Sequence, residues 1–217
     1  MDYASARATM VDSQLRTNKV TNQRLLDAFS AVPRELFVPE SQRGIAYIDE
    51  DLPIGERRFL MEPMVLARLL QAAAVAPSDI VLEIGSGSGY AAAILARLAE
   101  TVVALESDAT QRERANATLG ELGLDNVVVV DGGLTEGYPK QAPYNVILVS
   151  GAVDEIPPAI SDQLAEDGRL ATVLKAGSVM GQAVLMRRVG DVIASRVLFD
   201  AATPLLPEFR RDAGFQF

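Results

Sequence analysis

The 217-residue chain contains no cysteine, no histidine and no tryptophan. Without cysteine there can be no disulfide framework, no thiol nucleophile and no iron–sulfur cluster. Without histidine the usual general base and the commonest transition-metal ligand are missing, so no metal site is expected. Any catalysis by this chain must therefore work without a thiol or an imidazole.

Long apolar runs and positive charge are also scarce. No uninterrupted apolar run approaches the ~18 residues of a membrane span, and the segment Met1-Asp2-Tyr3-Ala4-Ser5 lacks the basic-then-apolar order of a secretory signal. Because 29 acidic residues outnumber 20 basic ones, a nucleic-acid backbone is disfavoured as the main partner. We expect a soluble, cytoplasmic protein with no nucleic-acid or membrane partner. Three arginine pairs are interpreted as solvated ends of elements: Arg57-Arg58, Arg187-Arg188 and Arg210-Arg211.

Composition and length favour a single globular domain. The chain is 49% hydrophobic and 23% charged, which is typical of folded proteins, and its length suits one domain over residues 1–217. We divide it into an N-terminal helical, substrate-side region (1–75) and a sheet core that binds the cofactor (78–217). In the first region the predicted helices are 4–17, 22–31 and 63–71, with Thr21 as an N-cap and Pro63 in a first turn.

From residue 80, short apolar runs alternate with helical segments. The predicted strands are 80–84, 101–105, 127–130, 146–150 and 169–174; the predicted helices are 90–98, 111–122 and 158–164. This alternation implies right-handed crossovers and a mainly parallel sheet. The extended runs 183–189 and 192–199 flank Gly190-Asp191 and predict an antiparallel hairpin. The expected fold is α/β and Rossmann-like, with helices on both faces of the sheet, a C-terminal antiparallel hairpin and an N-terminal helical extension.

The most informative segment is VLEIGSGSGY, residues 81–90. It reads as a buried strand, a glycine turn and a helix start, an order that lets backbone N–H groups approach a ligand. A dinucleotide fingerprint, G-x-G-x-x-G, would need its third glycine at Tyr90, so a nicotinamide dehydrogenase is disfavoured. The G-x-G-x-G spacing after an acidic residue resembles motif I of class I S-adenosylmethionine (SAM) methyltransferases. The cofactor-binding residues predicted in this segment are Glu83, Gly85, Ser86, Gly87 and Gly89.

Acidic residues fall at the ends of three successive predicted strands, where ligands bind in open α/β sheets. Glu83 ends the first strand. Glu106 ends the second, a little over ~20 residues later, where a carboxylate can accept from both ribose hydroxyls. Asp131 follows the third strand and is placed to accept from the adenine amino group, with Gly132 leaving that edge open. Each also has a structural interpretation: a helix-terminus partner for Glu83, a solvated strand end for Glu106 and a simple turn for Asp131-Gly132.

Further segments extend the likeness beyond the glycine turn. They are MVDSQLR (10–16), VPRELFVPE (32–40), AYID (46–49), LPIG (52–55), GYP (137–139), APY (142–144), EIP (155–157) and GRL (168–170). With these, most of the chain resembles the protein-L-isoaspartate O-methyltransferase family. The resemblance implies methyl transfer from SAM to the side-chain carboxylate of an isoaspartyl residue in damaged protein. Because that acceptor is already an anion at pH 7 and SAM carries its own sulfonium leaving group, such an enzyme needs alignment more than a general base.

The chain departs from the family at the acceptor site. After "PIG" the family runs into "QTIS", whose hydroxyls help to hold the substrate, whereas this chain has Phe59 for the threonine and Met61 for the serine. Neither side chain offers a conventional hydrogen bond to a carboxylate, and each lost contact costs about 1–3 kcal/mol. No catalytic residue is therefore assigned, and Arg57 and Arg58 are the candidates for contacting an anionic group of the acceptor.

Three functional hypotheses follow. The chain is a SAM-dependent O-methyltransferase whose acceptor, a protein, peptide or small molecule, is no longer isoaspartate. Alternatively it is an isoaspartyl methyltransferase that holds its substrate through backbone groups and shifted side chains. The third hypothesis is a SAM- or S-adenosylhomocysteine-binding sensor or scaffold without catalysis.

Overall fold

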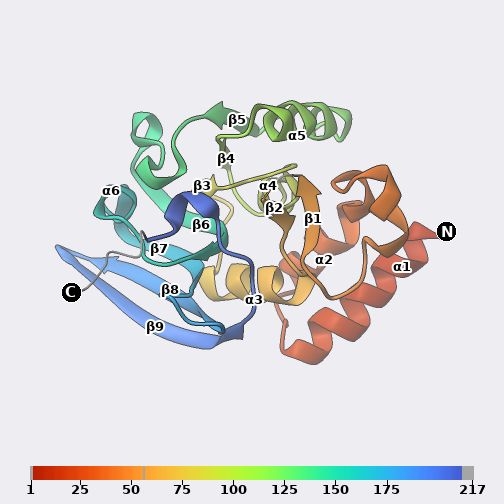
Figure 1. Ribbon diagram of the computed structural model, residues 1–217, viewed down its shortest axis with the longest axis horizontal. Helices are drawn as coiled ribbons and strands as arrows, with labels where there is room; N and C mark the ends of the chain where they lie inside the picture. The colour runs from red at the N-terminus through yellow and green to blue at the C-terminus, as the bar shows by residue number, and fades with distance from the viewer. Residues whose placement is uncertain (1, 56, 212–217) are drawn as a thin grey trace.

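The computed structural model describes residues 2–55 and 57–211, and its centre is a seven-stranded sheet (Figure 1). The strand order is β5-β4-β3-β6-β7-β8-β9. Strands β3 to β7 run parallel, while β8 is antiparallel to both of its neighbours. Their bounds are Ile80–Ile84 (β3), Thr101–Glu106 (β4), Val127–Asp131 (β5), Tyr144–Val153 (β6), Leu164–Leu174 (β7), Gly181–Val189 (β8) and Val192–Ala201 (β9). The predicted parallel sheet with a C-terminal hairpin is confirmed.

Alternating side chains of the buried strands build two separate cores. In β3, Val81 joins a cluster on one face of the sheet and Leu82 joins a cluster on the other. Because side chains alternate across a strand, near-continuous apolar runs are what a sheet covered on both faces requires. The apolar runs that predicted these strands are therefore explained by burial on both sides.

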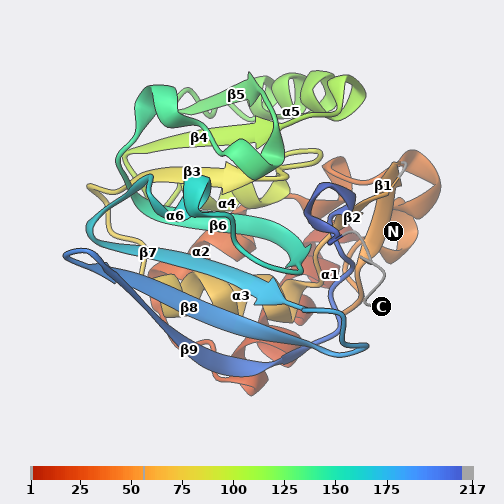
Figure 2. The same ribbon diagram turned by 60° about the vertical axis from the view of Figure 1, so that its left-hand side comes forward.

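Helices α1 to α5 contribute to the first cluster, and α1, α2 and α3 lie behind the sheet in Figure 2. The bounds are Tyr3–Met10 (α1), Gln23–Ala31 (α2), Pro63–Ala73 (α3), Tyr90–Ala96 (α4) and Ala109–Glu121 (α5). A π turn at Val11–Leu15 continues α1. The predicted N-cap of α2 is wrong by one position: Asn22, not Thr21, is the cap, and its Oδ1 accepts from the Leu25 N–H at 3.2 Å.

The other face is covered mostly by short segments. Helix α6 spans only Pro158–Ser161, shorter than the predicted 158–164, because Leu164 already pairs with Tyr144 in the sheet. Two 3₁₀ turns, Leu134–Glu136 and Pro207–Phe209, pack there as well. Within the described part of the chain, no helix is long and apolar enough to cross a membrane.

A small hairpin that the sequence did not predict lies beside the carboxyl ends of the main strands (Figure 2). It joins β1 (Leu52–Gly55) to β2 (Arg58–Leu60) in antiparallel pairing. In β2, Arg58 and Leu60 point inward while Phe59 is exposed. The hairpin therefore presents the segment that departs from the family pattern to the edge of the sheet where ligands bind.

Candidate cofactor and acceptor site

The glycine turn between β3 and α4 has the backbone shape that its sequence demands. Gly85, Gly87 and Gly89 have φ values of +74°, +53° and +94°, which side chains with a Cβ rarely adopt. Gly89 is the N-cap of α4. The Gly87 N–H donates to the Glu106 carboxylate at 2.8 Å, so the turn is tied to the next strand end.

Glu106 is the last residue of β4 and is completely buried. Its carboxylate accepts from the backbone N–H groups of Gly87 and Asp108, the latter at 2.9 Å. It also accepts from the Arg58 guanidinium, through Nη2 at 3.0 Å and Nε at 3.1 Å. The structural interpretation of Glu106 as a solvated strand end is therefore wrong, because this carboxylate has no access to solvent.

Arg58 is not at a solvated end, contrary to the prediction for the arginine pairs. Its side chain is 6% exposed and is shared between Glu106 and Glu208, whose Oε1 lies 2.6 Å from Nη2. Burial opposes the positive charge, but hydrogen bonds and attraction from Glu208 and Glu106 raise the pKa of Arg58 above its usual value. The structure thus places Arg58 on the predicted ribose carboxylate, whereas Arg57 lines the neighbouring cleft.

Glu83 and Ser86 bring buried polar atoms to the other side of the glycine turn. Glu83 is completely buried, and its Oε1 accepts from the Ser150 hydroxyl at 2.6 Å. Glu83 Oε2 and Ser86 Oγ have no hydrogen-bond partner among the described residues. Burial, partly offset by the Ser150 hydrogen bond, raises the pKa of Glu83 to about 8. Such unpaired buried groups are costly unless a ligand or water satisfies them.

The raised pKa of Glu83 predicts a specific pH dependence of stability. Because the folded state holds this proton more tightly than the unfolded chain, the contribution to stability is complete below about pH 4.5 and is lost as pH rises to about 8. Glu83→Gln, which cannot ionise, should remove that loss of stability, which amounts to about 1.4 kcal/mol for each unit by which the pKa of Glu83 is raised on folding. Urea unfolding of both proteins from pH 5 to pH 8.5 measures the effect; parallel curves would contradict it.

Asp131 ends the strand next to that of Glu106, and Gly132 follows it, so these predicted residues lie at the same edge of the sheet. Asp131 pairs in register with Glu106, and its side chain is 71% exposed and forms an ion pair with Arg112 at 2.7 Å. A Cβ on Gly132 would lie 3.1 Å from Leu105 Cδ1, so a side chain there would be crowded. The absence of a side chain at Gly132 is compatible with the predicted adenine position.

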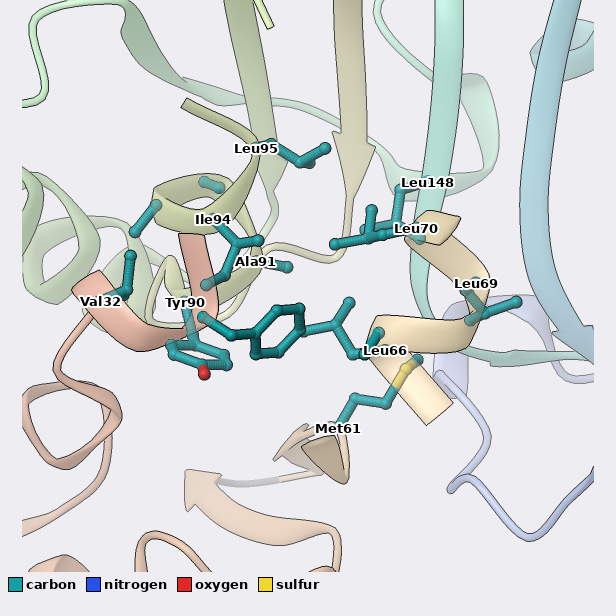
Figure 3. Packing of buried hydrophobic residues seen from close by; sticks show 14 of the residues in the cluster. Val32, Met61, Leu66, Leu69, Leu70, Tyr90, Ala91, Ile94, Leu95 and Leu148 are labelled. Carbon is teal, nitrogen blue, oxygen red and sulfur yellow. The ribbon is translucent and has the colours of Figure 1, made fainter. Parts of the chain in front are cut away.

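The two residues at the family's hydroxyl positions have different environments. Met61 is buried, and its side chain points into the apolar cluster toward Leu66 (Figure 3). Phe59 is 40% exposed. It lines an open cleft of about 430 Å³ together with Arg57, Leu205, Pro207 and Arg210. Met61 therefore serves the core, while Phe59 and two arginines shape the surface where an acceptor could lie.

The C-terminal segment of residues 203–211, which we call the C-terminal strap, completes the site. Leu206 packs against Gly85 and Gly151: a Cβ on Gly151 would lie 2.6 Å from Leu206 Cγ. The backbone N–H of Leu206 donates to the Ala152 carbonyl at 2.8 Å. The sequence singled out only Arg210-Arg211 in this segment, and the clue available was the apolar run at 204–206 after the final strand.

The described residues fit SAM in part. The positive-φ glycines, the unpaired atoms of Glu83 and Ser86, and the bare edge at Gly132 suit a ligand with an amino-acid end and an adenine ring. At Glu106, however, Arg58 already takes the acceptor positions. Between Phe59, Met61, Gly151 and Leu206 the cavity is only about 10 Å³, roughly room for one water.

Comparisons with known proteins point to one family. The family model for protein-L-isoaspartate(D-aspartate) O-methyltransferase (PCMT) matches residues 6–197. The chain is 41% identical over 201 residues to the protein-L-isoaspartate O-methyltransferase of Roseiflexus sp. (strain RS-1), covering 92% of this chain and 91% of the relative. A solved protein-L-isoaspartate O-methyltransferase superposes with a TM-score of 0.80 at 26% identity, covering 92% of this chain and 65% of that one. A Plasmodium falciparum structure in complex with S-adenosyl-L-homocysteine shares the fold, with a TM-score of 0.77 at 19% identity over 93% of this chain and 98% of that one.

Proposed function

This chain belongs to the protein-L-isoaspartate O-methyltransferase family of SAM-dependent methyltransferases, and we propose that it methylates an isoaspartyl carboxylate in a protein or peptide. The observation that carries the choice of acceptor is the cleft of about 430 Å³ flanked by Arg57 and Arg210. Two guanidinium groups at one cleft favour an anionic group in a chain whose net charge is −9. The carboxylate of an isoaspartyl residue meets that requirement.

The residues divide into a cofactor half and an acceptor half. In the first, the glycine turn and Glu83 would hold the amino-acid end of SAM, Glu106 the ribose, and Asp131 with Gly132 the adenine. When bound, SAM supplies a methyl group on a sulfonium: a carboxylate oxygen forms the new bond to carbon as the bond to sulfur breaks, leaving a neutral thioether. No proton moves in that exchange, which is consistent with a site without histidine or cysteine.

In the acceptor half, charge and apolar surface act together. Arg57 and Arg210 attract and orient the carboxylate, taking the part that the family gives to hydroxyl groups. Phe59, Leu205 and Pro207 supply apolar walls that displace water from the reacting oxygen. The ester formed carries no charge, so these arginines bind the substrate more strongly than the product, which favours release.

Labelled SAM with an isoaspartyl peptide tests the proposal directly, beside calorimetric SAM titration of the same preparation. We expect transfer to the isoaspartyl peptide and none to the matched aspartyl peptide. Replacing Arg57 or Arg210 with glutamine should raise KM for the peptide about fivefold, equivalent to ~1 kcal/mol for a partly exposed charge contact, with SAM affinity unchanged.

Arg187→Gln is the matched control. Arg187 is exposed on β8 and pairs with Asp167, so its loss removes one positive charge without touching the cleft. If Arg187→Gln raises KM as much as Arg57→Gln, the effect is long-range attraction rather than a contact. Absence of transfer despite SAM binding would refute isoaspartyl methylation.

One observation favours a second candidate function, a SAM- or S-adenosylhomocysteine-binding sensor without catalysis. Phe59 and Met61 provide no hydroxyl to the acceptor, and Met61 is committed to the core. This candidate requires cofactor binding with no transfer to isoaspartyl peptides or to other carboxylate-bearing peptides and small molecules. The same pair of measurements therefore separates the two functions.

A further inference from the structure

We propose that Arg58 is a built-in occupant of the cofactor site that must leave Glu106 before the ribose of the cofactor can bind there. The inference rests on the proposed function in one respect: it takes Glu106 as the ribose partner. It goes further in proposing that Arg58 competes with the cofactor for Glu106.

The first argument is that the Glu106 carboxylate is saturated. An ionised carboxylate offers about four acceptor sites. Oε1 accepts from Arg58 Nη2 at 3.0 Å, Arg58 Nε at 3.1 Å and the Asp108 N–H at 2.9 Å. Oε2 accepts from the Gly87 N–H at 2.8 Å and from Arg58 Nε at 3.2 Å. The Ser107 hydroxyl makes only a long contact with Oε1, at 3.5 Å, and the backbone donors are fixed by the turns that carry them. Arg58 is therefore the donor that must give way to two ribose hydroxyls.

The second argument is that Arg58 can leave Glu106 without becoming an unpaired charge. Its Nη1 and Nη2 also donate to the Glu208 carboxylate, at 3.3 Å and 2.6 Å, and Nη2 donates to Ser107 Oγ at 3.0 Å. The Glu208 side chain is 33% exposed, whereas that of Glu106 is 0% exposed. A shift of the guanidinium toward Glu208 thus moves it from a dry carboxylate to a wetter one, which avoids the large cost of a buried lone charge.

The third argument comes from the C-terminal strap. Glu208, which holds Arg58, lies two residues after Leu206, which packs on Gly85 and Gly151. With a cavity of only about 10 Å³ left beside Leu206, a cofactor reaching from the glycine turn toward Phe59 requires the strap to move. Arg58 links Glu106 at the end of β4 to Glu208 on the strap, so release of Arg58 from Glu106 also removes this link between the strap and the sheet.

This arrangement has an unusual consequence for variants of Arg58. An interaction that stabilises the ligand-free protein but competes with the ligand must, when weakened, lower stability and raise affinity together. A purely structural arginine would lower stability and leave affinity unchanged or reduced. The two roles are therefore separable by measuring both quantities on the same proteins.

The test uses the full chain and S-adenosyl-L-homocysteine, which binds without turnover. Thermal unfolding and calorimetric titration are run on the parent protein, Arg58→Gln and Arg58→Lys; the lysine keeps the charge, loses the forked contact and protects the fold. We expect a lower Tm without ligand and about tenfold tighter binding for Arg58→Gln, with a smaller change of the same sign for Arg58→Lys. Arg169→Lys is the matched control, because Arg169 forms a similar partly buried pair with Asp79 at 2.7 Å near the opposite ends of the strands.

Each outcome decides the proposal. Lower Tm with unchanged or weaker binding in both Arg58 variants, or an equal gain in Arg169→Lys, overturns it. If binding tightens only in the Arg58 variants but no protein transfers methyl to an isoaspartyl peptide, the inference stands and the proposed function fails. If the parent transfers methyl and all four proteins bind equally, the function stands and the inference fails. Binding by none of them overturns both.

Discussion

Replacing Glu106 with alanine is expected to lower the free energy of unfolding by about 3 kcal/mol. The change removes a completely buried carboxylate and leaves the 6%-exposed guanidinium of Arg58 with Glu208 as its remaining carboxylate partner. It also leaves the N–H groups of Gly87 and Asp108 without the acceptor that they now share. Breaking one side of a buried pair costs more than the pair itself contributes, because the remaining charge stays desolvated.

Urea unfolding of Glu106→Ala against the parent measures this loss. The double variant Arg58→Met with Glu106→Leu is the informative companion, since replacing both charges with apolar side chains should recover much of the lost stability. A loss under 1 kcal/mol in Glu106→Ala would show that the pair is solvated in solution.

In an Arg58→Gln background, Glu106→Ala should weaken binding of S-adenosyl-L-homocysteine by about 1–3 kcal/mol, because there no guanidinium competes with the ribose for the carboxylate.

The parts of the fold that sequence could predict are those governed by local pattern. The run Ile80–Ile84 is apolar except for Glu83 and forms a strand that is buried on both faces from its second residue onward, and the glycines at 85, 87 and 89 occur where positive φ values are needed. The predicted strands also locate their own ends, so the sequence indicates that Glu106 and Asp131 lie at the edge of the sheet where ligands bind, and the structure pairs them in register. The predicted N-cap of α2 is Thr21, one position before the observed cap Asn22, because threonine and asparagine are both good N-caps.

The parts that sequence could not predict depend on contacts between distant segments. Arg58 meets Glu106 and Glu208 across separations of 48 and 150 residues, and no periodicity reports such a meeting. An arginine next to another arginine is typical of a solvated end of an element. Burial of Arg58 is possible only because Glu106 and Glu208 pair with its charge. The small hairpin was missed for a related reason: Leu52–Gly55 contains a proline and a glycine, and its strand form depends on pairing with Arg58–Leu60.

Arg34→Met is the second substitution with a large expected effect. It should lower the free energy of unfolding by about 3–4 kcal/mol and weaken binding of the acceptor. Arg34 is completely buried, with Nε donating to the Ala46 carbonyl at 2.7 Å and Nη2 to the Met61 carbonyl at 2.9 Å. Its guanidinium also lies 4.8 Å from the centre of the Tyr90 ring. Methionine fills similar volume but donates nothing, so two buried carbonyls lose their partners at about 1–3 kcal/mol each.

The loss should be larger at pH 8 than at pH 5. Burial, together with Asp51, Asp49 and Glu50, raises the pKa of Glu62 to about 7, and the positive charge of Arg34 opposes that rise. Without Arg34 the pKa of Glu62 rises further, and a carboxyl whose folded-state pKa is raised costs stability as pH increases through that value. Urea unfolding at both pH values measures the difference. Arg34→Lys keeps the charge but cannot reach both carbonyls. It should therefore restore the pH dependence of the parent but not the stability that the two hydrogen bonds contribute. If its stability matches that of the parent at both pH values, the hydrogen bonds from Arg34 to the Ala46 and Met61 carbonyls do not stabilise the fold.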